Sequence, residues 1–527
     1  MSVDIAIRNG LVVDGTGVEP VLADVGLRGD RIAVVGEVPE AAQEIDAAGK
    51  VVAPGFIDIH SHSDFTLLID PRAASAVHQG VTLEVVGNCG FGCFPLLNTE
   101  LAPKAIYGHS EEIPLTWDSA AGYFERLEEA APAINVASLV PNGQIRLSVV
   151  GLHDRPARPD ELTQMRYLLD EALEQGAWGY STGLEYAAER GADEDELVSM
   201  CVTCGRRHGI YATHTRRRDE GADEAVAEAL RTAERSGVRL QVSHLVPRNG
   251  IDSARRCLEL VEGAAAGGMD VAFDMHTRLY GTTFLLTTLP PWALEEPSRL
   301  REILSSSEQR RKMHGYESIL SAGGDWSRIV LLDNNVWPAY ARRDIASIAA
   351  ERGREPLDAV YDLLLGAADD PGQLMVIIHA YTEEQQREAF AHPLCVPGSD
   401  ATTMAPDGPL AGKIFHGAYT WAAWYLRFCV QQEQVLSLEE AIHRLTLQPA
   451  ERIGIPDRGV LRVGAHADVV VFDPAVFREE GTTFDPSRLA TGMDTVIVNG
   501  TVTLSGGELT GARKGRVLRH PARPMLS

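Results

Sequence analysis

The stretch VVAPGFIDIHSH, residues 51–62, decides the fold class. It is an apolar, strand-like run that ends in polar residues, and seven later runs have the same form. These are residues 81–89, 133–142, 177–183, 209–215, 238–245, 269–276 and 394–400. Amphipathic stretches with helical spacing, such as 159–175 and 223–237, lie between most of them. Eight alternating units predict a (β/α)8 barrel of the TIM type in the α/β class, with catalytic groups at the carboxyl ends of its strands.

The two ends of the chain differ from this middle part. Both read as short strands broken by Gly and Asp, and chain ends often lie close together in a domain. A long gap precedes the eighth barrel strand, and it contains further strand-like runs at 328–334 and 374–380. The predicted domains are a small β-sandwich at 1–54 plus 452–527, a barrel at 55–451 and an inserted subdomain around 283–370.

Composition excludes several classes of protein. The chain has 48 Lys and Arg against 74 Asp and Glu, a net charge of −26, which argues against nucleic-acid binding. No apolar run approaches the roughly 20 residues that span a bilayer, and the N-terminus lacks the features of a signal peptide. Seven cysteines do not suggest a disulfide framework. We expect a cytoplasmic protein with a small-molecule partner; the sequence leaves open whether it is a homo-oligomer.

Metal-ligand side chains stand at the ends of the predicted strands. Alternate residues of a strand point to one face, so the two histidines that end the first strand both face the barrel mouth. The full set is His60, His62, Cys89, His214, His244 and Asp400. Imidazole, thiolate and carboxylate together favour zinc, and this set can hold one or two ions.

Each of these residues also has an ordinary structural interpretation. A single histidine at a strand end is more often a hydrogen-bonded core residue, Cys89 alone is a small buried hydrophobe, and Asp400 alone is a helix cap. Their joint occurrence at the ends of the right strands favours the metal site. By contrast, Cys201 and Cys204 lie in a helical stretch without a second ligand pair, so we interpret them as packing residues.

Four segments resemble a known family. They are PGFIDIHSHSD at 54–64, VTLEVVGNCGFGCFPL at 81–96, GAWGYSTGLEYA at 176–187 and the C-terminal stretch at 445–474. They are similar to the amidohydrolase superfamily and, within it, to the N-acyl-D-amino-acid deacylases, or D-aminoacylases. The resemblance covers nearly the whole chain. It implies a metal-dependent barrel joined to a small β-sandwich, and hydrolysis of an amide bond.

The resemblance also implies a role for each ligand. His60 and His62 would serve one metal site. Cys89, His214 and His244 would serve the other, which in this family is the tightly held zinc. Asp400 would be the general base and then the general acid. Bound zinc lowers the pKa of water to about 7, which supplies the nucleophile at neutral pH.

The anion that bridges two metals is unusual in this sequence. Many superfamily members, among them ring-opening hydantoinases, use a carboxylated lysine at the end of the fourth strand. Here no lysine occurs between Lys104 and Lys312. The bridge must therefore come from elsewhere, and both Cys89 and Glu185 are candidates. The missing lysine disfavours a ring-opening hydrolase.

At three positions where the family is expected to bind its substrate, this sequence has a different residue. The lysine after the sixth-strand histidine is replaced by Val246, the seventh-strand tyrosine by His276, and the third strand ends in Asn142 rather than histidine. We infer the same chemistry on an altered substrate. The candidate substrate contacts are Arg216, His276, Arg278, Tyr280, Asn142 and His379.

These observations predict zinc-dependent hydrolysis of the amide bond of an N-acyl amino acid, with water attacking the carbonyl. One alternative is an amidohydrolase for a different small amide, such as a dipeptide or an acylated aryl compound. The other is a catalytically silent barrel used as a scaffold. The retention of all six ligands argues against the scaffold.

Overall fold

The computed structural model describes residues 2–294, 296–316, 318, 320–321 and 324–521. Residues 1 and 522–527 of the predicted sandwich, and five positions of the predicted insertion, lie outside the described residues. The described chain divides into two compact units. The larger contains residues up to 247, 252–277 and the chain from 384 onward; the smaller contains 248–251 and 278–383.

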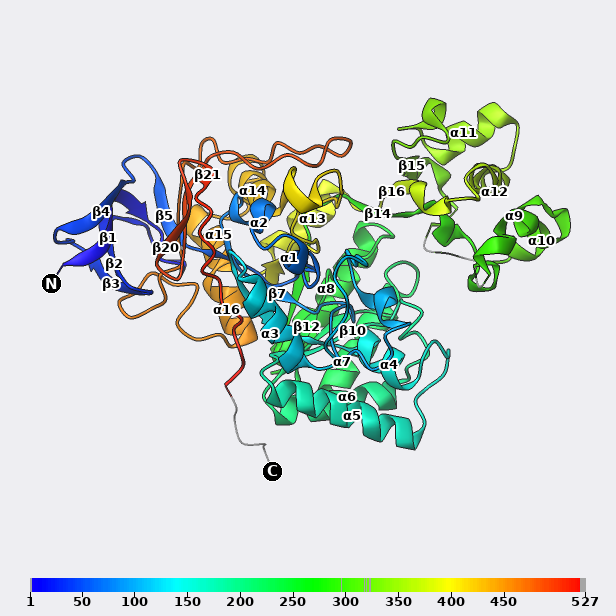
Figure 1. Cartoon of the computed structure of the whole chain (residues 1–527), viewed down its shortest axis with the longest axis horizontal. Coiled ribbons are helices and arrows are strands. Elements are labelled where there is room, and N and C mark those ends of the chain that lie inside the picture. The colour runs from blue at the N-terminus through cyan, green and yellow to red at the C-terminus, as the bar shows by residue number, and fades with distance from the viewer. Residues whose placement is uncertain (1, 295, 317, 319, 322–323, 522–527) are drawn as a thin grey trace. The chain divides into compact units, whose positions relative to one another are not determined.

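Strands from both ends of the chain form one nine-stranded sheet within the described residues. The β1–β5 ribbon and the β20–β21 ribbon lie side by side in Figure 1. The strands are β1 (Val3–Val12), β2 (Val21–Arg28), β3 (Arg31–Gly36), β4 (Ala41–Asp46), β5 (Val51–Pro54), β18 (Val469–Phe472), β19 (Met493–Val498), β20 (Thr501–Ser505) and β21 (Glu508–Leu509). One edge of β1 pairs first with β4 and then, at Leu11 and Val12, with β5. Alternating Val, Ile and Leu side chains of these strands are buried together, which explains why the two ends of the sequence fold as one module.

The sequence pattern suggests one continuous strand at 51–62. The structure has two strands there instead. β5 joins the terminal sheet by pairing antiparallel with β18, and β6 (Phe56–Asp58) starts a parallel sheet with β7. Gly55 lies between them. A Cβ atom at this position would lie 2.2 Å from the hydroxyl of Thr82 in β7, so only glycine allows the link between β5 and β6 to lie this close to β7.

Each of the eight predicted barrel segments contains a parallel strand. They are β6, β7 (Val81–Val86), β8 (Asn135–Ser138) continued by β9 (Val140–Pro141), β10 (Gly179–Gly183), β11 (Ile210–His214), β12 (Arg239–Val242), β13 (Val271–Met275) and β17 (Cys395–Pro397). Hydrogen bonding runs in the orders β6-β7-β8 and β9-β10-β11-β12-β13-β17. A parallel bridge between Ser61 and Ala401 joins the ends of β6 and β17. All carboxyl ends therefore face the same way.

Amphipathic helices connect these strands. The main ones are α3 (Ala120–Ala130), α4 (Asn142–Val149), α5 (Pro159–Glu174), α6 (Glu194–Arg206), α7 (Ala222–Ser236), α8 (Ile251–Ala266), α13 (Glu383–Ala391), α15 (Leu438–Leu445) and α16 (Leu447–Ile453). Ser119 and Asp193 cap the first turns of α3 and α6 through their side-chain oxygens. Helices α5, α6 and α7 pack in sequence order beside one another (Figure 1).

The smaller unit has its own core. Its antiparallel sheet consists of β14 (Tyr280–Phe284), β15 (Ile329–Leu331) and β16 (Met375–His379), and its main helices are α9 (Leu300–Ser305), α10 (Ser307–Met313), α11 (Ile345–Arg352) and α12 (Pro356–Gly366). Buried leucines and isoleucines of these elements pack together. The unit is wider than the predicted insertion of 283–370, because β16 pairs with β14 and so belongs to it.

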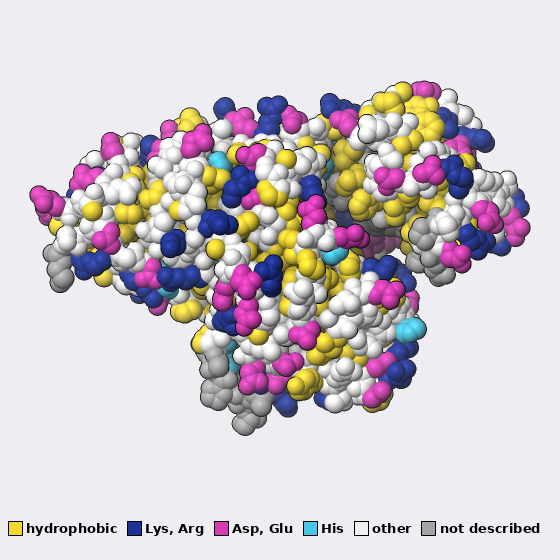
Figure 2. All heavy atoms as spheres, in the orientation of Figure 1, with side chains coloured by type: hydrophobic (Ala, Val, Ile, Leu, Met, Phe, Trp, Pro, Cys, Tyr) yellow, Lys and Arg dark blue, Asp and Glu magenta, His cyan; other side chains and the backbone are white. Residues whose placement is uncertain are grey.

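Figure 2 shows acidic and basic side chains interspersed over the visible face. Among the described residues, no helix combines the length and the apolar character needed to cross a membrane.

Candidate metal centre

The strand ends bring the predicted ligands to one edge of the parallel strands. His214 is the last residue of β11, whereas His60 and His244 follow β6 and β12 by two residues. Cys89 and Asp400 follow β7 and β17 by three residues. Because the strands are parallel, residues that follow them directly gather on the same side of the sheet.

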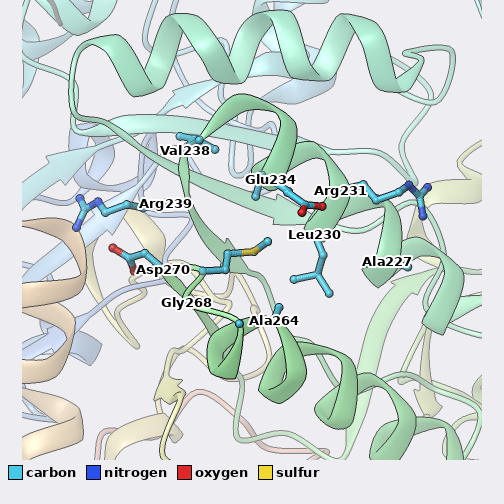
Figure 3. Close-up of a pocket in the computed structure, with 13 residues that line it drawn as sticks. Ala227, Leu230, Arg231, Glu234, Val238, Arg239, Ala264, Gly268 and Asp270 are labelled. Carbon is cyan, nitrogen blue, oxygen red and sulfur yellow. The ribbon is translucent and has the colours of Figure 1, made fainter.

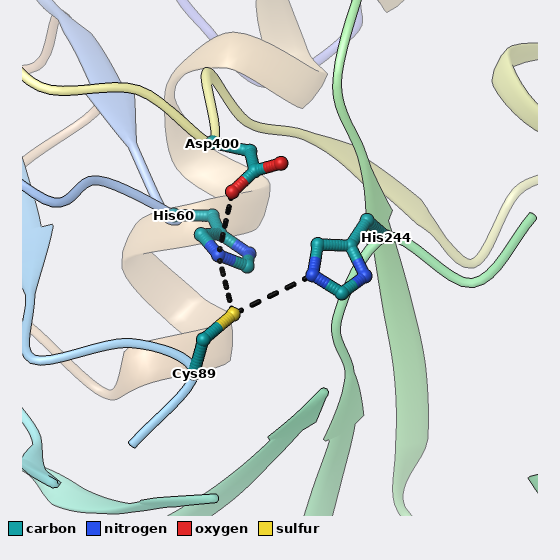
Figure 4. A group of neighbouring side chains, drawn as sticks. All are labelled: His60, Cys89, His244 and Asp400. Atoms are coloured by element: carbon teal, nitrogen blue, oxygen red, sulfur yellow. Dashed lines mark hydrogen bonds and ion pairs between the residues drawn. The ribbon is translucent and has the colours of Figure 1, made fainter. Parts of the chain in front are cut away.

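Four of these side chains form a tight group (Figure 4). His60, Cys89, His244 and Asp400 each offer one ligand atom, and all four atoms lie within 4.8 Å of one another. The Cys89 sulfur lies 3.2 Å from His60 Nε2 and 3.4 Å from His244 Nε2, and Asp400 Oδ1 lies 3.6 Å from His60 Nε2. Three are fully buried, and the Asp400 side chain is 20% exposed. Two imidazoles, a thiol and a carboxylate at this spacing are the usual ligand set of zinc.

Backbone conformation supports a functional role for this group. Cys89, His244 and Asp400 have φ angles of 53°, 36° and 46°, in the left-handed region that residues with a Cβ rarely adopt. Such backbone strain costs of order 1–3 kcal/mol per residue and tends to persist at functional sites. We infer that the fold holds these three side chains in place against a local conformational preference.

Burial and neighbouring charges shift the pKa values of two members of this group. Burial opposes a charge on His60, but the Asp274 carboxylate and the Cys89 sulfur nevertheless raise the pKa of its imidazole well above the ordinary value. Burial raises the pKa of the Cys89 thiol to about 11. Two imidazoles, a thiol and a carboxylate at this spacing suit a divalent cation, and such binding displaces the protons of its ligands.

His62 and His214 lie beside the group rather than within it. His62 Nε2 lies 3.2 Å from Asp400 Oδ1. The ring centroid of His214 lies 4.6 Å from that of His244, but its Nε2 is 2.9 Å from a carboxylate oxygen of Glu185. Glu185, one of the two candidates for a ligand shared by two metal ions, thus lies within hydrogen-bond distance of the candidate ligand His214. The roles of these three residues stay predictions.

Asp274 is the contact that sequence analysis missed. Its Oδ1 accepts a hydrogen bond from His60 Nδ1 at 2.8 Å and another from the His244 backbone N–H at 2.8 Å. One carboxylate oxygen therefore holds two of the four candidate ligands. The available signal was a carboxylate near the end of a predicted strand, two residues before His276, but a buried aspartate in a strand is equally compatible with a purely structural role.

Two predicted substrate contacts have structural partners. Asn142 begins α4, is fully buried, and donates its amide hydrogen to Glu189 at 2.7 Å. Arg216 forms an ion pair with Glu228 at 2.9 Å and donates to the Arg190 carbonyl. Both are already engaged within the protein, so a role in substrate binding stays a prediction for each.

Of the other four predicted contacts, one lies in the larger unit. His276 is buried, and its ring centroid lies 6.5 Å from that of His244. Arg278, Tyr280 and His379 belong to the smaller unit, where Tyr280 pairs with His379 across β14 and β16. Their part in substrate binding stays a prediction as well.

Comparison with known proteins decides the family. The model of the amidohydrolase family matches residues 43–504. The chain belongs to the amidohydrolase family. The resemblance noted in the sequence is therefore confirmed, and the protein is a hydrolase of carbon–nitrogen bonds in amides other than peptide bonds.

Three relatives of this amidohydrolase are informative. The N-acyl-D-glutamate deacylase of Alcaligenes xylosoxydans xylosoxydans is 33% identical, over 98% of this chain and 97% of its own. The N-acyl-D-glutamate deacylase of Bordetella bronchiseptica, solved with zinc and a phosphonate mimic of the tetrahedral intermediate, superposes with a TM-score of 0.79 at 30% identity. A D-aminoacylase with a binuclear metal centre has the same TM-score and identity. The alignments cover 98% of this chain and 100% of both structures.

A buried glutamate beside the site makes the amidohydrolase's stability depend on pH. Burial raises the pKa of Glu189 to about 7, although Asn142 and the Gly183 N–H donate to it. The folded state therefore binds this proton more tightly than the unfolded chain. Stability is unaffected below pH 4.5 and falls as pH rises toward 7, by about 3 kcal/mol at most.

We expect Glu189→Gln to remove this dependence. The free energy of unfolding of the variant, minus that of the parent, should rise by up to about 3 kcal/mol when the pH is raised from 5 to 8. Denaturant unfolding at the two pH values measures the difference. Glu125→Gln, on the exposed side of α3, is the control. A difference between parent and Glu189→Gln that is the same at both pH values would contradict the prediction.

Proposed function

We propose that this amidohydrolase uses zinc to hydrolyse the amide bond of an N-acyl amino acid. The single observation that carries the proposal is the convergence of His60, Cys89, His244 and Asp400 within 4.8 Å. The zinc complex of the Bordetella deacylase supports the choice of metal, and the binuclear D-aminoacylase supports one or two ions. The names of the relatives favour substrates of the D series.

The proposal includes the architecture that positions the site. We infer that the two parallel sheets close into one (β/α)8 barrel, since the bridge from Ser61 to Ala401 joins the first strand to the last. We also infer that the terminal sheet folds over as a β-sandwich at β1, where its pairing changes from β4 to β5. At all seven described cysteine positions the thiol is free, which supports a reducing compartment such as the cytoplasm.

Asp400 is the proposed proton carrier. When bound, zinc lowers the pKa of water and polarises the amide carbonyl. Asp400 accepts a proton from the attacking water, because it is the most exposed of the four side chains and faces both His60 and His62. It then delivers the proton to the leaving nitrogen, which would otherwise depart as a very poor leaving group.

Other residues hold the ligands and the substrate. Cys89 contacts both His60 and His244 and would be the ligand shared if two ions bind, whereas Glu185, which contacts His214, would be the alternative shared ligand. Of the predicted substrate contacts in the larger unit, His276 would contact the rest of the amino acid. Because Val246 replaces the family's lysine, we expect the preferred substrate to differ from that of the relatives.

A substrate panel tests this proposal. Matched D and L forms of N-acetyl amino acids with acidic, basic, aliphatic and aromatic side chains would be assayed for release of the free amine. We expect turnover of at least one class, with the D form preferred by about 100-fold or more, because the chiral carbon carries the leaving nitrogen and is held rigidly in the productive pose. Dipeptides and acylated anilines test the alternative amides. No turnover on any N-acyl amino acid would overturn the proposal.

A further inference from the structure

A row of buried polar side chains leads from the candidate metal centre to helix α16. It runs from His60 through Asp274 and Gln241 to Arg452, and each member contacts the next. Asp274 and Gln241 are each 2% exposed, and the Arg452 side chain is 9% exposed. Burying a polar group costs free energy unless the group is hydrogen-bonded. A row in which each member contacts the next therefore indicates a specific structural role.

We propose that Gln241 and Arg452 are positioning residues of the metal centre. They hold the Asp274 carboxylate so that it orients the ligand His60 and the backbone of the ligand His244. The inference rests on the proposed function in one respect, that these two histidines bind zinc.

The chemistry of Asp274 explains what it does to His60. An ionised carboxylate can only accept hydrogen bonds, so the hydrogen of the His60 imidazole lies on Nδ1. That leaves Nε2, which faces Cys89 and Asp400, as the nitrogen available to a metal. Partners of this kind fix the tautomer and the ring orientation of metal-binding histidines.

The direction of hydrogen bonding along the row is fixed by both neighbours of Gln241. Arg452 can only donate, and its Nε lies 3.1 Å from Gln241 Oε1. The Gln241 amide is therefore oriented with its NH2 group toward Asp274, and Nε2 lies 3.2 Å from Oδ2. The Asp274 carboxylate only accepts hydrogen bonds, so both neighbours of Gln241 favour the same orientation of its amide.

Gln241 satisfies the carboxylate oxygen that His60 and His244 do not use. Asp274 Oδ1 serves both histidines, and Oδ2 receives the Gln241 hydrogen. If this donor is lost, Asp274 Oδ2 loses a buried hydrogen bond, and the carboxylate can rotate or take up a proton. Either change weakens its hold on His60.

Arg452 is itself anchored at the opposite ends of the strands. It forms an ion pair with Asp270 and donates to the Leu240 carbonyl. Asp270 is half exposed and lines a cavity of about 670 Å³ between α7 and α8, together with Arg239 (Figure 3). The row thus ties a solvent-facing ion pair to a buried metal ligand.

A double-mutant cycle on zinc affinity tests the inference. The full-length protein is stripped with a chelator and titrated with zinc against a chromophoric competitor. We expect Asp274→Asn to lower zinc affinity by about 10- to 100-fold and Gln241→Leu by about tenfold. If Gln241 acts through Asp274, Gln241→Leu should change affinity less than about twofold in the Asp274→Asn background. Gln241→Glu keeps the volume and the Arg452 contact but turns an oxygen toward Asp274, so it should be impaired at least as much as Gln241→Leu.

A second readout separates positioning from a general loss of packing. In the cobalt-substituted protein, the visible absorption spectrum should change in Gln241→Leu and Gln241→Glu. Gln79→Leu, which removes another fully buried glutamine with backbone partners only, should leave zinc affinity and the cobalt spectrum unchanged. Unchanged affinity in Gln241→Leu, or an equal loss in both backgrounds, would overturn the inference alone. A parent protein that binds no zinc would overturn the metal centre as well.

Discussion

Asp400→Asn should lower kcat by about 10³-fold or more while zinc stays bound. Asparagine keeps the size and one acceptor oxygen, but it can neither take the proton from water nor return it to the leaving nitrogen. General acid–base catalysis contributes about 10²- to 10⁴-fold, and Asp400 performs both steps. Steady-state kinetics on the best substrate of the panel, together with zinc content per chain, measures the effect.

The control for Asp400→Asn is a neighbouring aspartate. Asp407 is exposed and pairs with Arg72, outside the metal centre. Asp407→Asn should therefore keep the parent's kcat. If Asp400→Asn retains turnover within tenfold of the parent, the carboxylate is not the proton carrier and the proposed mechanism is wrong.

Cys89→Ser should lower zinc affinity by more than about 100-fold. Loss of an outer partner of a ligand costs about 10- to 100-fold, and Cys89 is proposed as a direct ligand that contacts two others. A serine hydroxyl is a much weaker zinc ligand than a thiolate, because it stays protonated at neutral pH. Competition titration measures the affinity, and excess zinc should restore part of the activity.

Cys93→Ser provides a matched control in the same loop. Cys93 is also fully buried, four residues further along, and among the described residues it is not part of the four-residue group. The Cys93→Ser variant should bind zinc with the same affinity as the parent. If Cys89→Ser and the parent bind zinc with equal affinity, the Cys89 sulfur is not a zinc ligand and the prediction is wrong.

The convergence of four candidate ligands could be predicted from the sequence because the fold fixes their place. Residues just after a parallel strand must gather at one edge, so His60, Cys89, His244 and Asp400 could be paired although they lie far apart in the chain. The stretches that carry them also resemble a known family, and the family match confirms that resemblance.

The supporting contacts could not be predicted in the same way. Asp274, Gln241 and Arg452 read as a strand carboxylate, a strand amide and a helix cation, and residues of each kind are common in proteins without any link to a functional site. Their connection depends on which side chains meet in the core, and no spacing rule encodes that. The limits of the smaller unit were missed for a similar reason, because only the pairing of β14 with β16 assigns both strands to it.

Anomalous diffraction at the zinc edge, from crystals of the zinc-loaded and active protein, tests the central claim most directly. The account predicts a strong peak bounded by His60 Nε2, the Cys89 sulfur, His244 Nε2 and the Asp400 carboxylate, with ligand distances of about 2.0–2.3 Å. An active protein with zinc bound elsewhere, and no peak among these four side chains, would contradict it.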